Sequence, residues 1–307
     1  MILLTGATGF LGSNLLRELL RKQSFDVVCI KRKNSDCRKV IDIMNCCYWF
    51  DSDIEDLENL FKRYQITSII HCATVYGKNQ GEYFDVVKSN LVFSLQLVEL
   101  ATKYNCKYFI NSDSFYTREI NNNLWENNYR IYLDEYVKTK YIFKNMIHDH
   151  IDALNLCFIN MQLEHIYGAE DRNEKFVNWL INSLQSNCES VELTQGIQTR
   201  DWTYIDDVVN AYLCILDNLE QFNINKYYHF EIGTGVETSL KDFAYCVKRI
   251  TKSVTKLKFG EQKNMSYGEL MHSRADNEEL KRMGWNPCYN IEEGIMKVIE
   301  INNKNMC

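Results

Sequence analysis

Tyr136 and Lys140 stand four residues apart in a stretch whose pattern predicts a helix, so both side chains should share one face. A tyrosine phenol has a pKa of about 10 and exchanges protons poorly at neutral pH unless a nearby cation lowers that pKa. Among the nineteen tyrosines, only Tyr136 has a lysine at this offset. The pair predicts a general acid or base, although the same spacing is common on solvated helix faces.

Ser112 favours the catalytic interpretation. It follows the predicted strand Lys107–Asn111 and precedes Tyr136 by 24 residues. In parallel sheets the ligand lies at the carboxyl ends of the strands. A hydroxyl at that position could hydrogen-bond a carbonyl or alkoxide oxygen while Tyr136 protonates or deprotonates it. We therefore predict that Ser112, Tyr136 and Lys140 are catalytic.

The chain begins with an apolar strand, Ile2–Leu4, followed by three glycines spaced three apart. Gly6 permits a tight turn, and Gly9 lets a pyrophosphate approach the backbone. Gly12 lets the following helix, Ser13–Lys22, pack close to the strand. The amides at the start of that helix would face the phosphates. Strand, glycine turn and helix together predict a dinucleotide site, and an ordinary glycine-rich turn is the weaker interpretation.

The residues after the second predicted strand bear on the choice of dinucleotide. An NAD site carries an acid there that binds the ribose hydroxyls, whereas this chain has Lys31, Arg32 and Lys33. These cations could hold a 2′-phosphate, with Arg32 or Lys33 as the clamp, which predicts NADP(H). A solvated basic loop is the alternative. Asp51 or Asp53, after the third predicted strand, could accept a hydrogen bond from the adenine amino group.

Apolar runs alternate with amphipathic patterns through the first half of the chain. The predicted strands are Ile2–Leu4, Phe25–Ile30, Cys46–Phe50, Ser68–Cys72, Lys107–Asn111 and Leu154–Met161. The longest predicted helices are Tyr83–Tyr104 and Leu133–His150. This alternation predicts an α/β fold with a Rossmann-type doubly wound parallel sheet. After Gly168 the pattern is less regular, and we expect a smaller C-terminal α/β lobe for substrate, beginning with a helix at Phe176–Ser186.

Composition excludes several other kinds of protein. The chain of 307 residues has a net charge of −6, which argues against nucleic acid or an anionic membrane surface as its main partner. Its twelve cysteines include no Cys-x-x-Cys pair, so we expect buried free thiols rather than disulfides, and no metal site. The absence of a secretory signal and of a bilayer-spanning apolar segment predicts a cytoplasmic protein.

Taken in order, these motifs resemble those of the extended short-chain dehydrogenases/reductases, and the resemblance spans essentially the whole chain. The matching segments are Thr5–Gly12, His71–Thr74, Asn90, the trio Ser112, Tyr136 and Lys140, and Arg200–Asp207. The resemblance implies that Lys140 also binds the nicotinamide ribose and that Arg200 contacts a nucleotide-sugar diphosphate. With the basic and acidic residues above, the expected NADPH/NADP site comprises Gly6, Thr8, Gly9, Phe10, Leu11, Gly12, Lys31, Arg32, Lys33, Asp51, Asp53, Ala73, Thr74, Asn90, Tyr136 and Lys140.

A finer resemblance is to nucleotide-sugar 4-ketoreductases of the CDP-abequose and CDP-paratose synthase type, which reduce the 4-keto group of CDP-3,6-dideoxyhexuloses. The matching segments are Asn111–Phe115, Gln162–Gly168 and Met271–Asp276, whereas Lys138 stands where that family usually has a serine. The resemblance implies NADPH-dependent reduction of the C4 ketone of a nucleoside-diphosphate-linked 4-keto-deoxysugar, hexose or heptose, for bacterial surface polysaccharides. The implied substrate contacts are Asp113, Ser114, Glu164, His165, Arg200 and Arg274, and Trp125 and Tyr129 could stack on the ligand.

The implied domains are an NADP-binding Rossmann domain, 1–168 with 199–235 returning to it, and a nucleotide-sugar-binding lobe, 169–198 with 236–307. The resemblance also implies a homodimer formed through the helices Tyr83–Tyr104 and Leu133–His150.

Alternatives remain for both the reaction and individual residues. An NAD-retaining 4-epimerase could use the same serine, tyrosine and lysine. A 4,6-dehydratase would need a glutamate base directly after Asp113, where this chain has Ser114, which cannot remove a carbon-bound proton. A non-enzymatic relative would be expected to lack the tyrosine or the lysine. Structural hydrogen bonds are an equal possibility for Glu164 and His165, as is an ion pair with Asp206 or Asp207 for Arg200.

Overall fold

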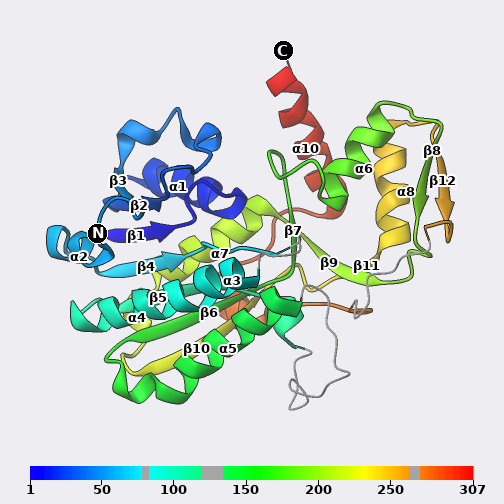
Figure 1. Ribbon diagram of the computed structural model, residues 1–307. Coiled ribbons are helices and arrows are strands. Elements are labelled where there is room, and N and C mark those ends of the chain that lie inside the picture. The colour runs from blue at the N-terminus through cyan, green and yellow to red at the C-terminus, as the bar shows by residue number, and fades with distance from the viewer. Residues whose placement is uncertain (78–82, 119–133, 263–269, 307) are drawn as a thin grey trace. The chain divides into compact units, whose positions relative to one another are not determined.

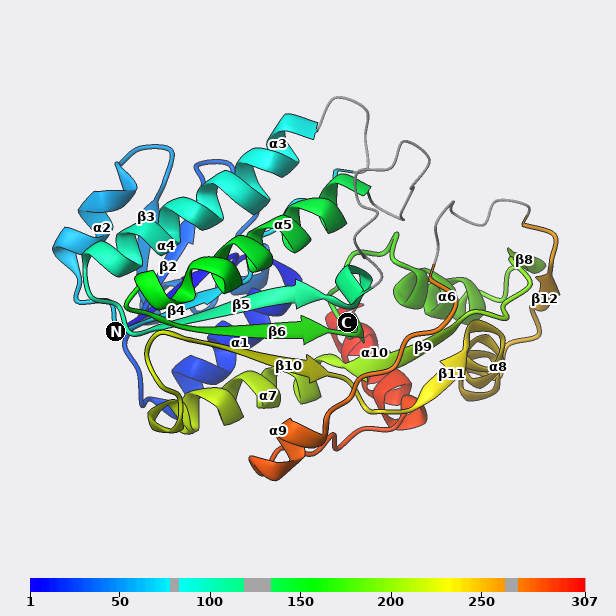
Figure 2. The same cartoon turned by 90° about the horizontal axis from the view of Figure 1, so that it is seen from below.

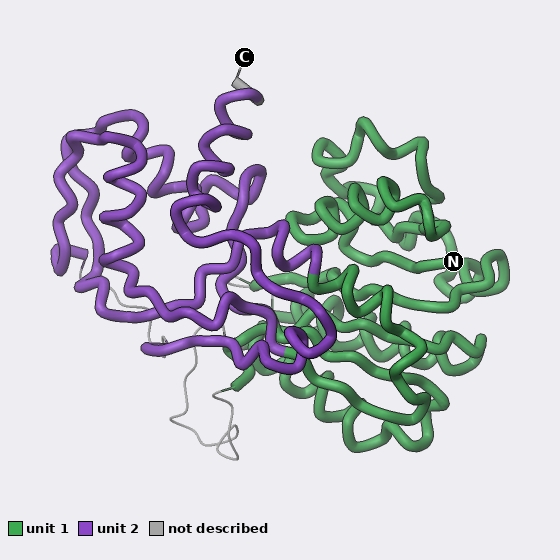
Figure 3. The backbone as a smooth tube through the Cα atoms, turned by 180° about the vertical axis from the view of Figure 1, so that it is seen from behind, with its two compact units in different colours: residues 1–129, 133–162, 211–230 green, residues 130–132, 163–210, 231–307 purple. Residues whose placement is uncertain are grey.

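The computed structural model describes residues 1–77, 83–118, 134–262 and 270–306 (Figure 1). By packing, the chain divides into two compact units (Figure 3): 1–129 with 133–162 and 211–230, and 130–132 with 163–210 and 231–307. The domains expected from the sequence were instead divided according to the ligand that each part would bind. They remain a prediction. Packing assigns 163–168, 199–210 and 231–235 to the second unit.

A seven-stranded sheet forms the centre of the first unit, in the order β10-β6-β5-β4-β1-β2-β3. Its strands are β1 (Ile2–Thr5), β2 (Val27–Lys31), β3 (Tyr48–Asp51), β4 (Ser68–His71), β5 (Tyr108–Ser114), β6 (Cys157–Leu163) and β10 (Lys226–Ile232). The pairs β1–β2, β1–β4, β2–β3 and β4–β5 run parallel. The predicted doubly wound fold is confirmed. All six predicted strands are present with ends displaced by up to three residues, whereas β10 was not predicted.

Helices cover both faces of this sheet. They are α1 (Phe10–Lys22), α2 (Leu57–Arg63), α3 (Tyr83–Val87), α4 (Phe93–Lys103), α5 (Asp134–His150) and the C-terminal part of α7 (Ile205–Asp217). Figure 2 shows α4 and α5 on one face and α1 and α7 on the other. An ion pair of 2.6 Å between Lys22 and Asp217 joins α1 to α7. Because both faces are covered, β1 and β4 are buried along their whole lengths, and their sequences, ILLT and SIIH, show no alternation of apolar and polar residues.

The direction of winding reverses between β1 and β4, where ligands bind in sheets of this type. The glycine turn after β1 lies against the segment after β4 at this switch point. Gly6 has a φ of +70°, and a Cβ there would lie 2.7 Å from the backbone nitrogen of Ala73. Only glycine permits this approach, so the fold brings the first and fourth strand ends together at the expected ligand position.

The second unit is the smaller α/β lobe expected after the Rossmann part. Its elements are β7 (His165–Tyr167), α6 (Phe176–Gln185), β8 (Ser190–Leu193), β9 (Thr199–Tyr204), β11 (Glu237–Ser239), α8 (Leu240–Thr251), β12 (Lys256–Phe259), α9 (Glu278–Arg282) and α10 (Ile291–Met306). Strands β11, β9 and β7 form one sheet, and β12 and β8 form another.

The cysteines in the described parts of the chain are all free, but only Cys29, Cys106 and Cys157 are buried. The expectation of buried thiols is therefore wrong for the rest. None of the described helices is both long and apolar enough to cross a membrane. A cytoplasmic location remains a prediction.

Candidate active site

The glycine turn fits a pyrophosphate. Gly9 caps α1 without a side-chain hydrogen bond, and the first turn of that helix carries no acidic residue. The amides of this turn are therefore free of a competing carboxylate, and the helix dipole favours an anion there. A Cβ on Gly12 would overlap the carbonyl oxygen of Gly6, whereas one on Gly9 would meet only that oxygen, at 3.2 Å. The turn therefore requires glycine at positions 6 and 12 because its own backbone leaves no room for a side chain there. At Gly9 the turn is open, and a ligand can approach its backbone.

Asn90 holds the segment that follows β4. It lies in a π-helical turn, Lys88–Val92, between α3 and α4. Its amide exchanges two hydrogen bonds of 2.8 Å with the backbone of Val75, and its Nδ2 donates to Thr139 Oγ1 at 3.3 Å. Thr74 also donates to it. Asn90 was predicted among the cofactor residues, and that role remains a prediction; in the structure it positions the segment Thr74–Val75.

A buried hydrogen-bond chain that the sequence did not reveal joins β1 to β4. Thr5 Oγ1 pairs with His71 Nδ1 at 2.8 Å, and His71 Nε2 pairs with Ser94 Oγ at 2.8 Å. Burial, together with the charge of Lys140, lowers the pKa of His71 to about 3. The imidazole is therefore neutral at physiological pH, and its two nitrogens serve to fix the strand ends beside the glycine turn.

The basic segment after β2 is arranged differently from the prediction. Lys31 Nζ lies 2.9 Å from Asp51 Oδ2, and this contact holds the pKa of Asp51 below its usual value. The two residues were predicted to contact the 2′-phosphate and the adenine, but they neutralise each other. Asp53 accepts a hydrogen bond from the backbone of Lys33 at 2.9 Å. Arg32 is exposed, and its guanidinium makes no hydrogen bond or ion pair with any described residue.

The structure brings the three predicted catalytic residues together. Ser112 lies in β5 near its carboxyl end, and Tyr136 and Lys140 lie one turn apart on α5. All three are buried. Lys140 Nζ donates to the backbone carbonyl of Ser112 at 2.6 Å, which fixes the helix against the strand end.

The environment of Tyr136 differs from the expectation that Lys140 lowers its pKa. Burial raises the pKa of Tyr136 well above its usual value, and the nearby ring of Tyr76, with centroids 4.8 Å apart, adds to the rise. A hydrogen bond with Ser114 only partly opposes it. Burial also lowers the pKa of Lys140. The phenol is therefore fully protonated at neutral pH.

Asp113 is buried in an ion pair rather than directed to a ligand. Its carboxylate lies 3.0 Å from Lys144 Nζ and also accepts from Thr117 and Asn160 at 3.0 Å each. Burial alone would raise the pKa of Asp113, but the charge of Lys144 and the hydrogen bonds outweigh it and hold that pKa below its usual value. These contacts involve Asp113 Oδ2, and the predicted substrate contact of Asp113 remains a prediction. Lys144 was missed, although it continues the four-residue spacing of Tyr136 and Lys140.

The remaining predicted substrate residues lie in the second unit. Glu164 accepts a hydrogen bond from Ser273 at 2.6 Å. His165 packs edge-on against Trp202 with centroids 4.5 Å apart, and burial lowers its pKa to about 3. These contacts within the second unit agree with the alternative that Glu164 and His165 have structural roles. Trp125 and Tyr129 lie outside the described residues.

Arg200 is buried and donates to the carbonyl of Thr199 at 2.7 Å, whereas Arg274 is exposed. Two acids of the segment Arg200–Asp207, Asp201 and Asp207, accept hydrogen bonds from backbone amides. Asp201 accepts from the backbone amides of Thr234, Gly235 and Ala275, and Asp207 accepts from those of Cys288 and Tyr289. Neither role was visible from the sequence, because every partner lies far along the chain.

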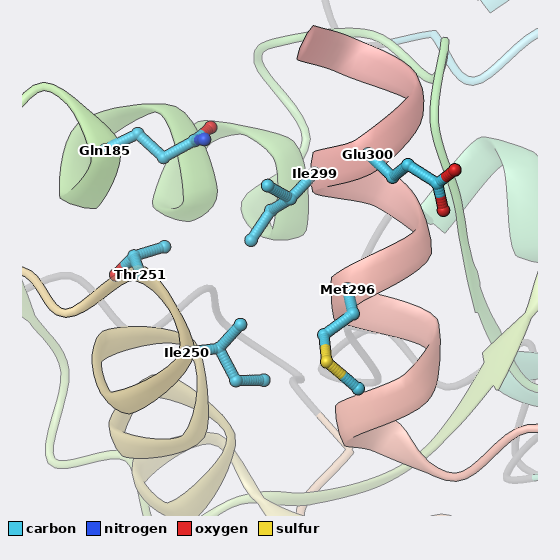
Figure 4. Close-up of a pocket in the computed structure, with 6 residues that line it drawn as sticks. All are labelled: Gln185, Ile250, Thr251, Met296, Ile299 and Glu300. Carbon is cyan, nitrogen blue, oxygen red and sulfur yellow. The ribbon is translucent and has the colours of Figure 1, made fainter. Parts of the chain in front are cut away.

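A hollow of about 390 Å³ in the second unit is unrelated to these groups. It is lined by Gln185, Ile250, Thr251, Met296, Ile299 and Glu300. Figure 4 shows the Glu300 carboxylate turned away from it. That carboxylate accepts from Lys304 at 2.8 Å. Three of the lining residues are apolar and three are polar, and none of them belongs to the predicted site.

A Rossmann sheet with a pyrophosphate cradle at its switch point, and a buried serine, tyrosine and lysine beside it, defines a class: dinucleotide-dependent enzymes that act at carbon–oxygen bonds. Residues 2–233 match the NAD dependent epimerase/dehydratase family, and the chain belongs to that family.

The relatives include a CDP-abequose synthase from Salmonella typhimurium, which is 34% identical and aligned over 97% of each chain. Among solved structures, UDP-glucose 4-epimerase from Thermotoga maritima superposes with a TM-score of 0.83 at 24% identity, covering 100% of this chain and 99% of the other. A dTDP-glucose 4,6-dehydratase from Bacillus anthracis, in complex with NAD, gives a TM-score of 0.81 at 17% identity, over 99% and 96%. The structural matches show the fold.

Proposed function

We propose that the protein uses NADPH to reduce the C4 ketone of a nucleoside-diphosphate-linked 4-keto-deoxysugar, with a CDP-linked sugar as the first candidate, for bacterial surface polysaccharides. Similarity to CDP-abequose synthase over 97% of both chains supports this substrate class. The observation that carries the reaction type is the neighbourhood of Tyr136, where Ser114 is its hydrogen-bond partner and Asp113 is paired with Lys144. A hydroxyl and a neutralised carboxylate are poor bases for a carbon-bound proton, which favours ketone reduction over dehydration.

Bound NADPH would supply the hydride. Tyr136 is protonated at neutral pH, so its phenol carries a proton for the oxygen that becomes the alcohol, although its raised pKa by itself makes the transfer less favourable. The Ser112 hydroxyl would hydrogen-bond the same oxygen and stabilise the negative charge that develops on it. Lys140, one helical turn from Tyr136 and bonded to the Ser112 carbonyl, would stabilise the phenolate left after proton transfer.

The preference for NADPH rests on Arg32 and Lys33, since Lys31 is paired with Asp51. Arg32→Ala should weaken NADPH binding about tenfold, the loss of one charge-assisted contact, and leave NADH binding unchanged. Arg38→Ala is the control, because Arg38 lies on the same segment but is paired with Asp36. Equal or better wild-type activity with NADH would refute the preference.

The experiment that tests the function incubates the protein with NADPH and a panel of nucleotide-linked 4-ketosugars, and determines the products by NMR. We expect one ketosugar to be reduced to a single C4 configuration. Tyr136→Phe should abolish turnover while the dissociation constant of NADPH, measured by fluorescence titration, stays within about twofold of wild type. Turnover retained by Tyr136→Phe would contradict the assigned acid.

An NAD-retaining 4-epimerase is the second candidate, favoured by the whole-chain structural match to UDP-glucose 4-epimerase. It could use the same serine, tyrosine and lysine. The absorbance of the purified protein separates the two: dinucleotide that copurifies at one equivalent favours the epimerase, whereas a cofactor-free protein that binds added NADPH favours the reductase.

We also propose a homodimer formed through α3, α4 and α5; in Figure 2, α3 and α4 follow one another end to end, and α5 lies alongside them. Large apolar side chains on these helices are unusually exposed: Phe84 at 80%, Val92, on the π-helical turn, at 54% and Met146 at 42%. Exposed apolar side chains on these neighbouring helices support the proposed interface.

A further inference from the structure

We propose that Tyr212 is a positioning residue for the reaction: its hydroxyl orients Ser112 so that the serine proton is directed to the substrate oxygen, with the thiol of Cys72 holding that proton until substrate binds. The inference rests on the proposed role of Ser112 in ketone reduction. Tyr212 lies on α7 and is fully buried. Its Oη donates to Ser112 Oγ at 2.7 Å, and Ser112 Oγ in turn donates to Cys72 Sγ at 3.3 Å.

The direction of this chain follows from the protonation of Tyr212. Burial raises the pKa of Tyr212 well above its usual value, Cys72 adds to the rise, and the hydrogen bond with Ser112 only partly opposes it. The phenol therefore keeps its single proton and donates it to Ser112. A serine hydroxyl has one proton and two lone pairs. With one lone pair occupied by Tyr212, Ser112 is fixed in position and acts toward a third group as a donor.

Cys72 suits the role of temporary acceptor. Burial raises the pKa of its thiol to about 11, so it is neutral at physiological pH and does not compete as an anion. Neutral sulfur is a weak hydrogen-bond acceptor. A ketone oxygen, and still more the oxygen that gains charge during reduction, accepts more strongly. The Ser112 proton can therefore turn from Cys72 to the substrate at little cost, and Tyr212 holds the serine oxygen in place meanwhile.

Three elements meet at this hydroxyl. Cys72 follows β4, Ser112 lies in β5, and Tyr212 comes from α7, 100 residues later in the chain. All three residues belong to the first compact unit. Removing the Tyr212 hydroxyl would leave Ser112 free to rotate and to use its proton elsewhere, without removing any group that contacts the substrate.

The test compares Tyr212→Phe with Tyr104→Phe. The control also removes a tyrosine hydroxyl bond of 2.7 Å, to Glu58, but at the amino end of β5, away from Ser112. For Tyr212→Phe we expect kcat to fall about tenfold while the KM for the ketosugar and the dissociation constant of NADPH change less than about twofold, because the bond to the oxygen strengthens in the transition state. Kinetics like those of Tyr104→Phe would overturn the proposal.

Cys72 provides a second variant that keeps the proposal falsifiable if Tyr212→Phe does not fold. Cys72→Ser replaces a weak acceptor by a strong one, so it should hold the Ser112 proton more firmly and lower kcat severalfold relative to wild type. A kcat unchanged in Cys72→Ser would contradict the role of the thiol.

A readout without turnover separates this inference from the proposed function. In protein labelled at the tyrosine ζ-carbon, the buried Tyr212 hydroxyl should give a slowly exchanging proton resonance in NMR spectra. This resonance should be absent from Tyr212→Phe and shifted in Ser112→Ala. If wild type reduces no ketosugar, the proposed function fails, but the resonance still shows whether Tyr212 donates a hydrogen bond to Ser112. A resonance unaffected by Ser112→Ala, or missing from wild type, would refute the bond itself.

Discussion

Lys144→Met would leave the carboxylate of Asp113 buried without its counter-charge. The ammonium and the carboxylate lie 3.0 Å apart, and the exposed fractions of the two side chains are 12% for Lys144 and 0% for Asp113. Methionine retains the apolar stem of lysine, so the substitution chiefly removes the charge. The change therefore tests whether this pair, rather than a substrate, accounts for the ionised state of Asp113.

The expected loss of stability follows from the geometry. At 3.0 Å and an effective dielectric constant of about 20, the attraction amounts to about 5 kcal/mol. Much of it offsets the desolvation of the two ions, but removing one partner leaves the other's desolvation uncompensated, at about 3–5 kcal/mol. We expect the free energy of unfolding at pH 7 to fall by about this amount. That is a large part of the ~5–15 kcal/mol typical of a folded protein.

The loss should depend on pH in a defined direction. In wild type the pKa of Asp113 is lowered in the folded state, so its contribution is present above a pH of about 4 and is lost as pH falls through the folded pKa. Without Lys144, its charge and its hydrogen bond no longer oppose the effect of burial on Asp113, so the pKa of Asp113 should be higher in the variant than in wild type. The variant's deficit should then be largest at neutral pH and shrink as pH falls toward about 4, because the buried acid binds its proton.

Equilibrium unfolding in urea at pH 7 and pH 5 measures these effects. Asp113→Asn in the Lys144→Met background should recover much of the stability, since a buried amide replaces a buried charge. Lys103→Met is the control: its pair with Glu58 is mostly exposed, and its loss should cost less than about 1 kcal/mol. A Lys144→Met deficit below about 1 kcal/mol, or one unaffected by pH or by Asp113→Asn, would refute the reasoning.

Two further predictions concern the cradle and the dimer. Gly12→Ala should destabilise the fold and abolish NADPH binding because its methyl group overlaps the Gly6 carbonyl. Gly9→Ala should fold and bind NADPH more weakly than wild type. Thermal unfolding and fluorescence titration would measure both effects, and equal behaviour of the two variants would contradict the assigned roles. Phe84→Glu should convert a dimer to a monomer in size-exclusion chromatography with light scattering, while a wild-type monomer would exclude the interface.

The parts of the fold that were predicted correctly depend on local signals. Strands such as Ile2–Thr5 and Ser68–His71 are buried along their whole lengths, so the apolar residues in each stand next to one another without alternation. The glycine spacing likewise follows from close backbone approach around a single turn. The edge strand Lys226–Ile232 was missed because most of its residues are exposed or only partly buried and they include lysine, histidine and glutamate.

The candidate site was predictable only in part. Helical periodicity is enough to place Tyr136 and Lys140 on one face, and the end of a parallel strand is enough to place Ser112 near the ligand. No local signal links Ser112 to Tyr212, 100 residues away. The substrate contact expected for Asp113 remains a prediction, but its ion pair with Lys144 was missed because it forms only when helix and strand pack together.

By itself, the sequence determined the Rossmann fold, the dinucleotide cradle and the identity of the serine, tyrosine and lysine. Hydrophobic periodicity, residue spacing and the positions of glycine are properties of neighbouring residues, so they can be seen without the structure. Only the tertiary structure decided which charges are neutralised, which way the hydroxyl protons point and that Tyr136 is protonated. Those properties depend on burial and on partners from distant segments, since the free energy of a charge or a hydrogen bond is set by what surrounds it after folding.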